Sequence, residues 1–307
     1  MSNPSRHPRR CGATISAPVV SIDSSDYQLV QLQNGAWSVR SNAEGETFHP
    51  VIGPVAEAES LYVQQLELPQ RVAESAGKTF VIWDVGLGAA ANTLTALRAL
   101  REIPGHSVRM VSFDHTPIPL EFALRHAEPL GYFGGYEDHV AGLLKSGTVE
   151  FAHGSGTVRW EFHGGDFPTR LASSDAAALP CPEAILFDAF SPARNAAMWT
   201  LPLFRSMRDR VDPLRPCSLA TYSRATLFRV SLLRAGWFVG AGSATGEKEE
   251  TTVAASSLEL LRRPLDATWL GRALRSTSAE PLEEAVYRQA PLSEASRQAL
   301  MNHPQFR

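Results

Sequence analysis

The sequence predicts an α/β protein whose core is a doubly wound, mostly parallel sheet of seven strands with an antiparallel edge strand. Short apolar runs, each about as long as a buried strand, alternate with patterns of helical spacing, the order expected of parallel strands joined by crossover helices. Phe80–Trp83 is followed by a turn with Gly86 and Gly88 and then by a helical pattern. In addition, an acid stands at or near the end of four successive predicted strands.

Length and composition are those of a globular protein with a sizeable core. The 307 residues are 44% hydrophobic and 20% charged, with a formal net charge of −3. No apolar run approaches the roughly 18 residues of a membrane span, and no signal-peptide core follows the N-terminus, so we expect a cytoplasmic protein that does not bind a membrane. The three cysteines are far apart and the nine histidines lack a metal-ligand spacing, so no metal site is expected.

The N-terminal region is expected to contain a tail and a small β-hairpin. Residues 1–22 are rich in Ser, Pro and Arg without periodicity, which predicts a disordered tail. Residues 23–75 are expected to form a unit of a hairpin and a helix. Two strand-like runs, Tyr27–Gln33 and Ala36–Ser41, flank Asn34-Gly35, a strong hairpin signal.

The loop after this hairpin, Gly45–Pro50, has a composition that no packing requirement explains. His49 in this loop is expected to be a surface residue rather than a catalyst, although it closely precedes the main glycine turn. Pro54 then opens a helical stretch that places Ala58 and Leu61 on one side.

Residues 76–260 are expected to form the main domain, beginning with the strand, turn and helix of Lys78–Arg98. Gly86 and Gly88 permit a sharp turn and a close approach of a ligand to the backbone, and the following helix presents free N–H groups to a polar or anionic group. Asp84, at the carboxyl end of the strand, is placed to bind such a ligand. Strand-to-helix turns also use glycine for steric reasons alone, so the turn by itself leaves both interpretations open.

Three further predicted strands carry an acid at or near their carboxyl end. Val108–Phe113 is followed by Asp114, Thr157–His163 by Asp166, and Glu183–Phe187 by Asp188. Ligands of open parallel sheets bind beyond these strand ends, and a carboxylate at a buried edge costs free energy unless something uses it. The four acids are therefore predicted to belong to one ligand site. For Asp114 the spacing fits a ribose-binding acid and equally a solvated carboxylate.

The rest of the chain continues the alternation of strands and helices. Gly131–Gly147 is expected to be a lid or a long connection before a strand at Thr148–Ala152. Beyond Asp188 the pattern predicts helices at Leu201–Val211 and Ala225–Ala235 and strands at Ser218–Tyr222, Trp237–Ala241 and Thr251–Ala255. The last two strands lack a helix between them and should form an antiparallel hairpin at the sheet edge. Residues 261–307 are expected to be a helical extension.

The motifs of the chain resemble those of the class I S-adenosylmethionine-dependent methyltransferases, whose fold is Rossmann-like. The segment Phe187–Trp199 is similar to one in the methyltransferase domain of the MnmC family, Asp-Gly-Phe-x-Pro-x-x-Asn-x-x-Met-Trp. Further matches are Thr221–Ser223 and a Gly-x-Lys-x-x-x-x-Val-Ala pattern at Gly246, Lys248, Val253 and Ala254. The resemblance covers about Glu46–Ala255.

This resemblance implies methyl transfer from S-adenosylmethionine to the aminomethyl nitrogen on the wobble uridine of certain tRNAs, without the FAD-dependent oxidase domain of some family members. A sulfonium methyl is already activated, so the protein must mainly align the reacting atoms and expose a neutral amine. Asp188 would orient the amine and accept its proton, Phe190 would shape a dry pocket for a flipped base, and Tyr222 would wall the pocket or stack on the base. The implied cofactor-binding residues are Asp84, Gly86 and Gly88 at the methionine end, Asp114 at the ribose and Asp166 at the adenine, together with Asn92 and Asp188.

The chain departs from the family pattern at two places, and other functions stay open. Ala90 replaces the third glycine of the turn, and residues 247–250 are acidic where the family is basic. The segment from Ser191 to Gly240 contains eight arginines and two aspartates, a net charge of +6. If several of these arginines converge beside Asp188, they form a tRNA-binding rim; if they do not, they belong to ordinary solvated helix faces. The alternatives are an aminopropyltransferase of the spermidine-synthase type and a cofactor-binding homologue without activity. No obligate protein partner is inferred.

Overall fold

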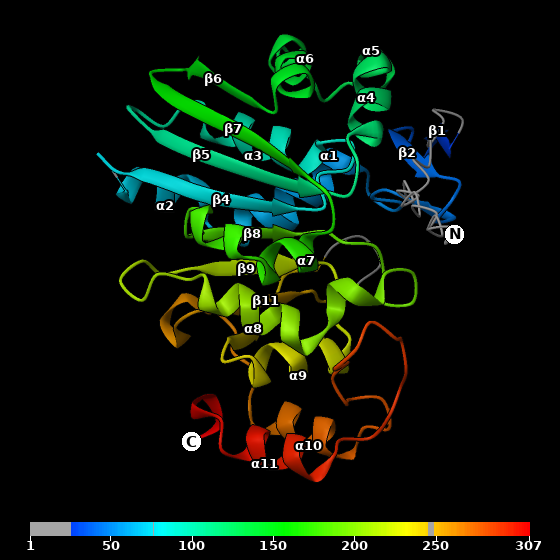
Figure 1. The fold of residues 1–307 in the computed structure, drawn as a ribbon, viewed down its shortest axis with the longest axis vertical. Coiled ribbons are helices and arrows are strands. Elements are labelled where there is room, and N and C mark those ends of the chain that lie inside the picture. The colour runs from blue at the N-terminus through cyan, green and yellow to red at the C-terminus, as the bar shows by residue number, and fades with distance from the viewer. Residues whose placement is uncertain (1–25, 76, 245–248) are drawn as a thin grey trace, which may run out of the picture.

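The computed structural model describes residues 26–75, 77–244 and 249–307, so the predicted tail lies outside the described residues. A large central sheet carries helices on both faces, and a small antiparallel sheet lies beside the carboxyl ends of its parallel strands (Figure 1). The predicted Rossmann-like α/β architecture is confirmed.

The central sheet has eight strands in the order β10-β11-β9-β8-β4-β5-β7-β6. Their bounds are β4 (Thr79–Val85), β5 (Ser107–Asp114), β6 (Thr148–His153), β7 (Gly156–Gly164), β8 (Ala184–Phe187), β9 (Ser218–Thr221), β10 (Phe238–Ala241) and β11 (Thr252–Ala255). Strands β9, β8, β4, β5 and β7 run parallel, whereas β11 is antiparallel to both neighbours and β6 is antiparallel to β7. The sheet therefore exceeds the predicted seven strands by one, because β6 pairs with β7 as an added hairpin. The expected closing hairpin at the other edge is present as β10 and β11.

Two hydrophobic cores cover the two faces of this sheet. Successive side chains of β4 alternate between them: Phe80 and Ile82 join one core, and Val81 and Trp83 join the other. The first core is covered by α1 (Pro54–Ala58), the π-helical η2 (Glu59–Gln64), α2 (Leu68–Glu74), α3 (Ala91–Leu100), α4 (Ile118–Arg125), α5 (Ala127–Leu130) and α6 (Glu137–Ser146). The second is covered by α7 (Phe167–Ala172), η3 (Ser174–Ala178), η4 (Ala196–Trp199), α8 (Leu201–Asp209) and α9 (Thr226–Arg234).

The segment Gly131–Gly147 is neither a lid nor a long connection. Most of it forms α6, which buries Val140 and Leu143 in the first core. A short helix with only two buried apolar residues gives a weak periodic signal in the sequence, and the prediction of a lid or a long connection was therefore wrong.

The segment after Leu261 contributes helices to the second core. Its elements are α10 (Ala267–Arg275), α11 (Glu294–Met301) and η6 (Pro304–Phe306), and η5 (Leu258–Leu260) precedes it. Trp269 and Leu300 are buried in the same core as α9, and Figure 1 shows α10 and α11 on the outer side of α9. Within the described part of the chain, no helix has the length and apolarity needed to cross a membrane.

The small sheet contains the predicted hairpin and one further strand. β1 (Tyr27–Gln31) and β2 (Trp37–Ser41) pair antiparallel, and β3 (Glu46–Thr47) pairs with the other side of β2. Gly35 at the tip has a φ of 84°, which glycine adopts without steric cost. β3 directs the following loop back toward the central sheet.

Candidate active site

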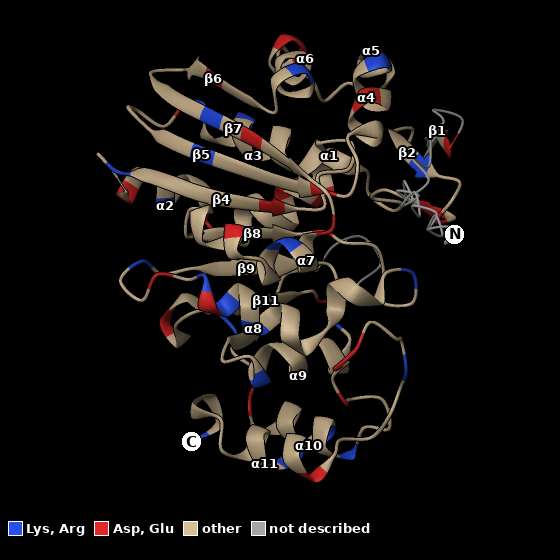
Figure 2. Ribbon diagram, viewed as in Figure 1, with Lys and Arg blue, Asp and Glu red and all other residues tan. Residues whose placement is uncertain are grey.

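A cavity of about 700 Å³ lies between the carboxyl ends of the parallel strands and the small sheet. Its volume is typical of a small-molecule site, and its place at the carboxyl edge is where open α/β sheets bind ligands. Every predicted site residue except Asp84 lines this cavity: Gly86, Gly88, Asn92, Asp114, Asp166, Asp188, Phe190 and Tyr222. In Figure 2 acidic positions gather where β4, β5 and β7 end.

The glycine turn is shaped by the protein as much as by a ligand. A Cβ atom on Gly86 would lie 2.6 Å from the carbonyl oxygen of Asp188, so glycine is needed for the close approach of the segments that follow β4 and β8. A Cβ atom on Gly88 would lie 3.2 Å from the ring of Phe48, which therefore fills the space beside this residue. At both positions, protein atoms occupy the space beside the glycine, where the sequence predicted the close approach of a ligand.

Ala90 occupies a backbone conformation that favours glycine. It lies at the start of α3 with a φ of 62°. A left-handed conformation costs an L-residue with a side chain about 1–2 kcal/mol. The chain therefore accommodates the replacement of the third glycine, with local backbone strain.

Asp114 joins the glycine turn to the end of β5. Its Oδ2 atom accepts a hydrogen bond of 2.7 Å from the Gly88 N–H, and Oδ1 accepts a longer one from Thr116 N–H. Burial raises the pKa of Asp114, while these N–H donors oppose the shift. The carboxylate is thereby fixed in the cavity wall at the position expected for a ribose-binding acid.

Asp84 lies beneath the cavity and does not line it. Its side chain is 0% exposed, and Oδ2 accepts hydrogen bonds from Thr93 Oγ1 at 2.6 Å and from Ser112 Oγ at 3.0 Å. Burial raises the pKa of Asp84 to about 7, although both hydroxyl donors oppose the shift. Asp84 thus connects β4, α3 and β5 directly behind the glycine turn. Asp84 was predicted to contact the ligand, but its side chain exposes no surface to the cavity.

Asp188 lies at the end of β8 in the cavity wall. Its Oδ2 atom accepts a hydrogen bond of 2.7 Å from the Asn92 side chain, so α3 holds the carboxylate. Burial raises the pKa of Asp188, and the positive charge of His49 opposes this shift. The arrangement presents a carboxylate that can accept a proton from a group in the cavity.

His49 was expected at the surface, and the structure places it inside the site. Its side chain is only 9% exposed, with Nδ1 3.9 Å from Glu57 Oε1 and Nε2 3.7 Å from Asp188 Oδ2. No residue spacing predicts this contact, because it depends on β3 folding back onto the central sheet. Glu57, on α1, was missed for the same reason. Across the described residues no group of three or more His, Cys, Asp or Glu has the geometry of a metal site.

Asp166 has a structural role beside its place in the cavity wall. It is the N-cap of α7, and Oδ2 accepts a 2.9 Å hydrogen bond from Thr169 N–H. Helix capping alone favours an aspartate at this position. The acid after β7 therefore has a physical explanation that does not require a ligand.

Aromatic side chains form the apolar part of the site. Phe190 packs against Phe48, with ring centroids 5.8 Å apart, and its carbonyl accepts a 2.7 Å hydrogen bond from Trp199 Nε1. Tyr222 donates a 2.9 Å hydrogen bond to the carbonyl of Ala189. The segment Ala189–Phe190 is thus held on both sides, which fixes the wall predicted to receive a base.

Charges in the cavity are strongly one-sided. Among the described lining residues there are seven carboxylates and no lysine or arginine. The acids are Asp26, Glu44, Glu46, Glu57, Asp114, Asp166 and Asp188. Such a lining favours cationic groups in the cavity and disfavours phosphates there.

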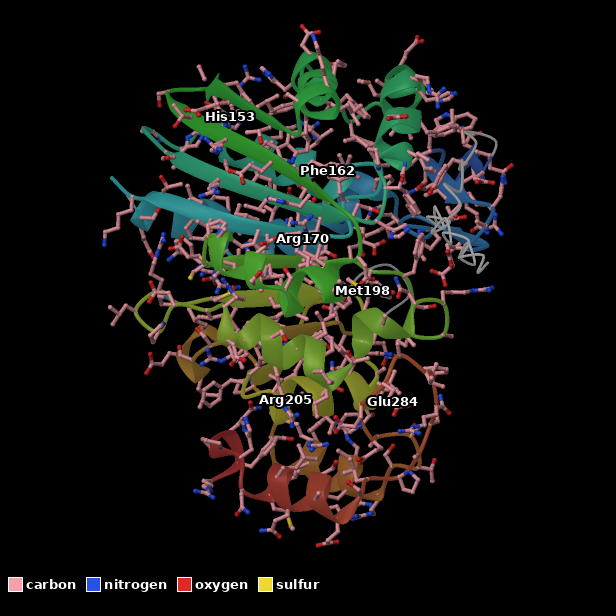
Figure 3. The ribbon with its side chains drawn as sticks, in the orientation of Figure 1. His153, Phe162, Arg170, Met198, Arg205 and Glu284 are labelled. Atoms are coloured by element: carbon pink, nitrogen blue, oxygen red, sulfur yellow. The ribbon has the colours of Figure 1, made fainter. Side chains whose placement is uncertain are left out.

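The arginines between Ser191 and Gly240 do not converge beside Asp188. Most bind other parts of the protein: Arg208 the Gly236 carbonyl, Arg210 the Leu179 carbonyl, Arg215 Glu183, Arg229 Glu250 and Arg234 Glu283. Arg194 is the exception near the cavity, with Nε 4.0 Å from Glu46 Oε1. Figure 3 shows Arg205 on α8, below Met198, a residue that lines the cavity.

The acidic loop is described only in part. Glu249 lies 3.9 Å from Arg224, and Glu250 pairs with the buried Arg229. These contacts neutralise part of the predicted basic rim. Gly246 and Lys248 of the family-like pattern lie outside the described residues, and Val253 and Ala254 are in β11.

Comparison with known proteins agrees with this architecture. Residues 138–257 match a family described as S-adenosyl-L-methionine-dependent methyltransferase. The chain is 31% identical to the tRNA 5-methylaminomethyl-2-thiouridine biosynthesis bifunctional protein MnmC of Burkholderia vietnamiensis, over 63% of this chain and 30% of that protein. The MnmC of Aeromonas hydrophila is 26% identical over 78% of this chain and 37% of its own length. The chain therefore spans about a third of the length of these relatives.

Solved structures share the fold. MnmC2 from Aquifex aeolicus superimposes with a TM-score of 0.65 at 24% identity, covering 90% of this chain and 84% of that one. Spermidine synthase from Thermotoga maritima gives a TM-score of 0.50 at 11% identity, covering 91% and 81%. Both similarities concern the fold alone.

Proposed function

Because the chain is an MnmC-like S-adenosylmethionine-dependent methyltransferase in sequence and fold, we propose that it methylates the aminomethyl nitrogen on the wobble uridine of tRNA. The observation that carries the proposal is the place of Asp188. This carboxylate ends β8 in the cavity wall, next to the glycine turn and to Phe190. It can therefore meet both an amine and the group that methylates it.

The cavity fits S-adenosylmethionine in size and charge. The ligand carries positive charge at its sulfonium and ammonium, and the described lining is acidic without lysine or arginine. Asp114 would hold the ribose hydroxyls, and the segment Gly86–Gly88 with Asn92 would face the methionine end. Asp166 would approach the adenine while it caps α7. When bound, S-adenosylmethionine supplies an activated methyl group that leaves its sulfur for a nucleophilic nitrogen.

The protein's own part in the reaction is to prepare the amine. A protonated amine has no lone pair to attack with, so it must first lose a proton. Asp188 is placed to accept this proton and to orient the nitrogen, and Asn92 holds its Oδ2 atom in place. Phe190, Phe48 and Tyr222 would exclude water from the uracil ring, and Tyr222 offers an aromatic surface for the base.

The charge of the cavity is compatible with a tRNA substrate only if the phosphates remain outside it. The aminomethyl group is a cation and suits the acidic lining, whereas the phosphates need basic residues at the rim. Arg194 lies beside Glu46, which lines the cavity, and its side chain is 55% exposed; the Arg224 side chain is 53% exposed beside Glu249. We assign these two arginines to phosphate contacts.

Salt dependence tests this assignment. Each neutralised phosphate releases counterions, so replacing Arg194 or Arg224 with Ala should flatten the plot of log affinity for tRNA against log salt by roughly one unit. Arg205→Ala, on α8 away from Met198, is the matched control and should leave the slope unchanged. An affinity for tRNA that does not respond to salt would argue for a small-molecule substrate.

The substrate itself is tested by competition among three candidates. The protein is incubated with S-adenosylmethionine and, in parallel reactions, with its decarboxylated form. Each reaction contains bulk tRNA from cells that lack the modification, polyamines or small amines. Methyl transfer to tRNA alone supports the proposal. Reaction of polyamines with the decarboxylated cofactor would establish the aminopropyltransferase alternative, and cofactor binding without any transfer would establish the inactive homologue.

A further inference from the structure

We propose that His49 is a positioning residue for the methyl-transfer step, and that its clamp between Glu57 and Asp188 keeps the Asp188 carboxylate charged and ready to accept the proton of the amine. The inference rests on the proposed function for the identity of the amine. The clamp itself is a property of the protein without substrate.

The geometry of the clamp is that of a cation between two carboxylates. The imidazole Nε2 lies 3.7 Å from Asp188 Oδ2, and Nδ1 lies 3.9 Å from Glu57 Oε1. These separations exceed those of direct hydrogen bonds, so the three side chains act on each other by charge. The side chains of His49 and Glu57 are 9% and 11% exposed, which leaves little water to screen them.

The backbone brings His49 to this place at a cost. His49 has a φ of 50°, in the left-handed region that few residues other than glycine adopt. The preceding residue, Phe48, is held by two hydrogen bonds: its N–H donates to the Val39 carbonyl, and Ser38 Oγ donates to its carbonyl. Phe48 also packs on Phe190. A strained residue held by its neighbours and aimed at a cavity wall is typical of a functional position.

The charges around Asp188 explain why a cation is needed there. Three ionisable neighbours of Asp188 carry a charge: His49 from the loop after β3, Glu57 from α1 and Asp84 from β4. Its other polar neighbours are Tyr62 from η2, Asn92 from α3 and Tyr222 after β9. Both tyrosines are neutral because burial raises their pKa. Within the described part of the chain, these three charged neighbours of Asp188 are acids, except for His49. Without its positive charge, burial and two nearby acids would favour a protonated Asp188, which cannot accept a proton.

The same neighbours bias His49 toward its charged form. Burial opposes protonation of the imidazole, but Glu57 and Asp188 outweigh it and raise the pKa of His49. The raised pKa means that His49 keeps its proton to a higher pH than a free histidine does. The proton lost by the substrate ammonium goes to Asp188, and the nitrogen lone pair then forms the bond to the methyl carbon while the electron pair of the broken carbon–sulfur bond stays on sulfur.

The test uses His49→Asn, because asparagine tolerates the left-handed conformation and carries no charge. In single-turnover methylation of unmodified tRNA, the acid limb of the pH–rate profile should move up by about one pH unit or more, the usual effect of losing an opposite charge within 4–6 Å. At a pH on that limb the rate should fall about 10-fold, which is one unit of pH on a slope of one. His139→Gln, on α6 and outside the cavity lining, should leave the profile unchanged.

A structural role is excluded by two further measurements. In an Asp188→Asn background His49→Asn should no longer move the profile, because the residue acts through Asp188. NMR titration of His49 in the protein without substrate should give a pKa above 6.5 that falls in both Glu57→Gln and Asp188→Asn.

The outcomes separate this inference from the proposed function. A normal or low pKa of His49, insensitive to both variants, overturns the clamp whatever the substrate is. An unmoved acid limb in His49→Asn also overturns it. If no tRNA is methylated while the NMR titration behaves as expected, the clamp stands and the proposed substrate is wrong.

Discussion

Two buried groups that contain histidine lie at opposite ends of the strands of the central sheet, and their histidines have different kinds of partners. At the carboxyl edge, His49 lies between two carboxylates at 3.7 and 3.9 Å and borders a cavity. At the amino edge, His153 is hydrogen-bonded to His106 at 2.8 Å and to Tyr136 at 2.7 Å. His106 is also hydrogen-bonded to the Ile103 carbonyl at 2.7 Å. Figure 3 places His153 at the far end of β6 from Met198 of the cavity.

The hydrogen bonds of His153 are all made within the protein, whereas the group around His49 borders the cavity. Burial lowers the pKa of His153 to about 4, so the fold keeps this imidazole neutral. The pKa of His49 is raised, because two acids overcome the cost of burial. Short, mutually satisfied hydrogen bonds rigidify the amino edge. The carboxyl edge instead has charged side chains beyond hydrogen-bond distance and residues with strained backbones, and a ligand in the cavity can bind to these charged groups.

The largest of the effects that test this contrast is expected for Asp114. Replacing it with Ala removes a carboxylate of the cavity wall that also accepts from the Gly88 N–H. Loss of hydrogen bonds to a charged group is expected to weaken S-adenosylmethionine binding by about 10- to 100-fold in calorimetry. Asp166→Asn is the comparison, because asparagine retains the cap of α7 and changes only the charge. Equal, unaltered affinity in both variants would place the ligand elsewhere.

At the amino edge the expected response is to acid. The pKa of His153 is lower in the folded than in the unfolded protein, so its contribution to stability is complete above about pH 6.5 and is lost as the pH falls toward 4. Between pH 7 and 5 the free energy of unfolding should fall by about 1–2 kcal/mol from this residue.

Urea unfolding at both pH values measures this loss. In His153→Gln, which cannot be protonated, the loss between pH 7 and 5 should be smaller than in the original protein. A loss of the same size in both proteins would show that other groups cause the acid sensitivity and that His153 is not its source.

The smallest effect concerns backbone strain at the glycine turn. Ala90→Gly relieves a left-handed alanine but adds the chain entropy of glycine, so the two roughly cancel and stability should change by less than about 1 kcal/mol. Ala96→Gly, in the interior of the same helix α3, also removes a buried methyl group but should destabilise by about 1 kcal/mol more. Thermal unfolding of the two variants compares them, and equal destabilisation would mean that Ala90 is not strained.

The sequence predicts those parts of the site that depend on local pattern. The ends of parallel strands meet at one edge, and the acids at or after the ends of β5, β7 and β8 line one cavity there. The sequence does not distinguish the depth of each acid: Asp84 is one of the same set but bonds Thr93 and Ser112 below the cavity. The cap formed by Asp166 is a second reason for an acid that pattern alone did not separate from ligand binding.

Long-range contacts were beyond the sequence pattern. His49 reaches Asp188 only because β3 pairs with β2 and turns the chain back, and no periodicity encodes that pairing. The arginine excess was read along the chain, whereas Arg229 and Arg234 point into ion pairs within the protein. The strand β6 was recognised, but its addition to the sheet as an eighth strand depends on pairing with β7.

Asp188→Asn tests the central claim most directly. Asparagine keeps the size of the side chain and one acceptor but cannot take the proton of the amine. Single-turnover methylation of tRNA that lacks the modification should slow by about 10²-fold or more, the usual range for a lost general base, while calorimetry shows little change in the dissociation constant for S-adenosylmethionine. Lost cofactor binding would assign Asp188 to the cofactor instead. Unchanged turnover in the variant would contradict the account and leave alignment of the reactants as the source of catalysis.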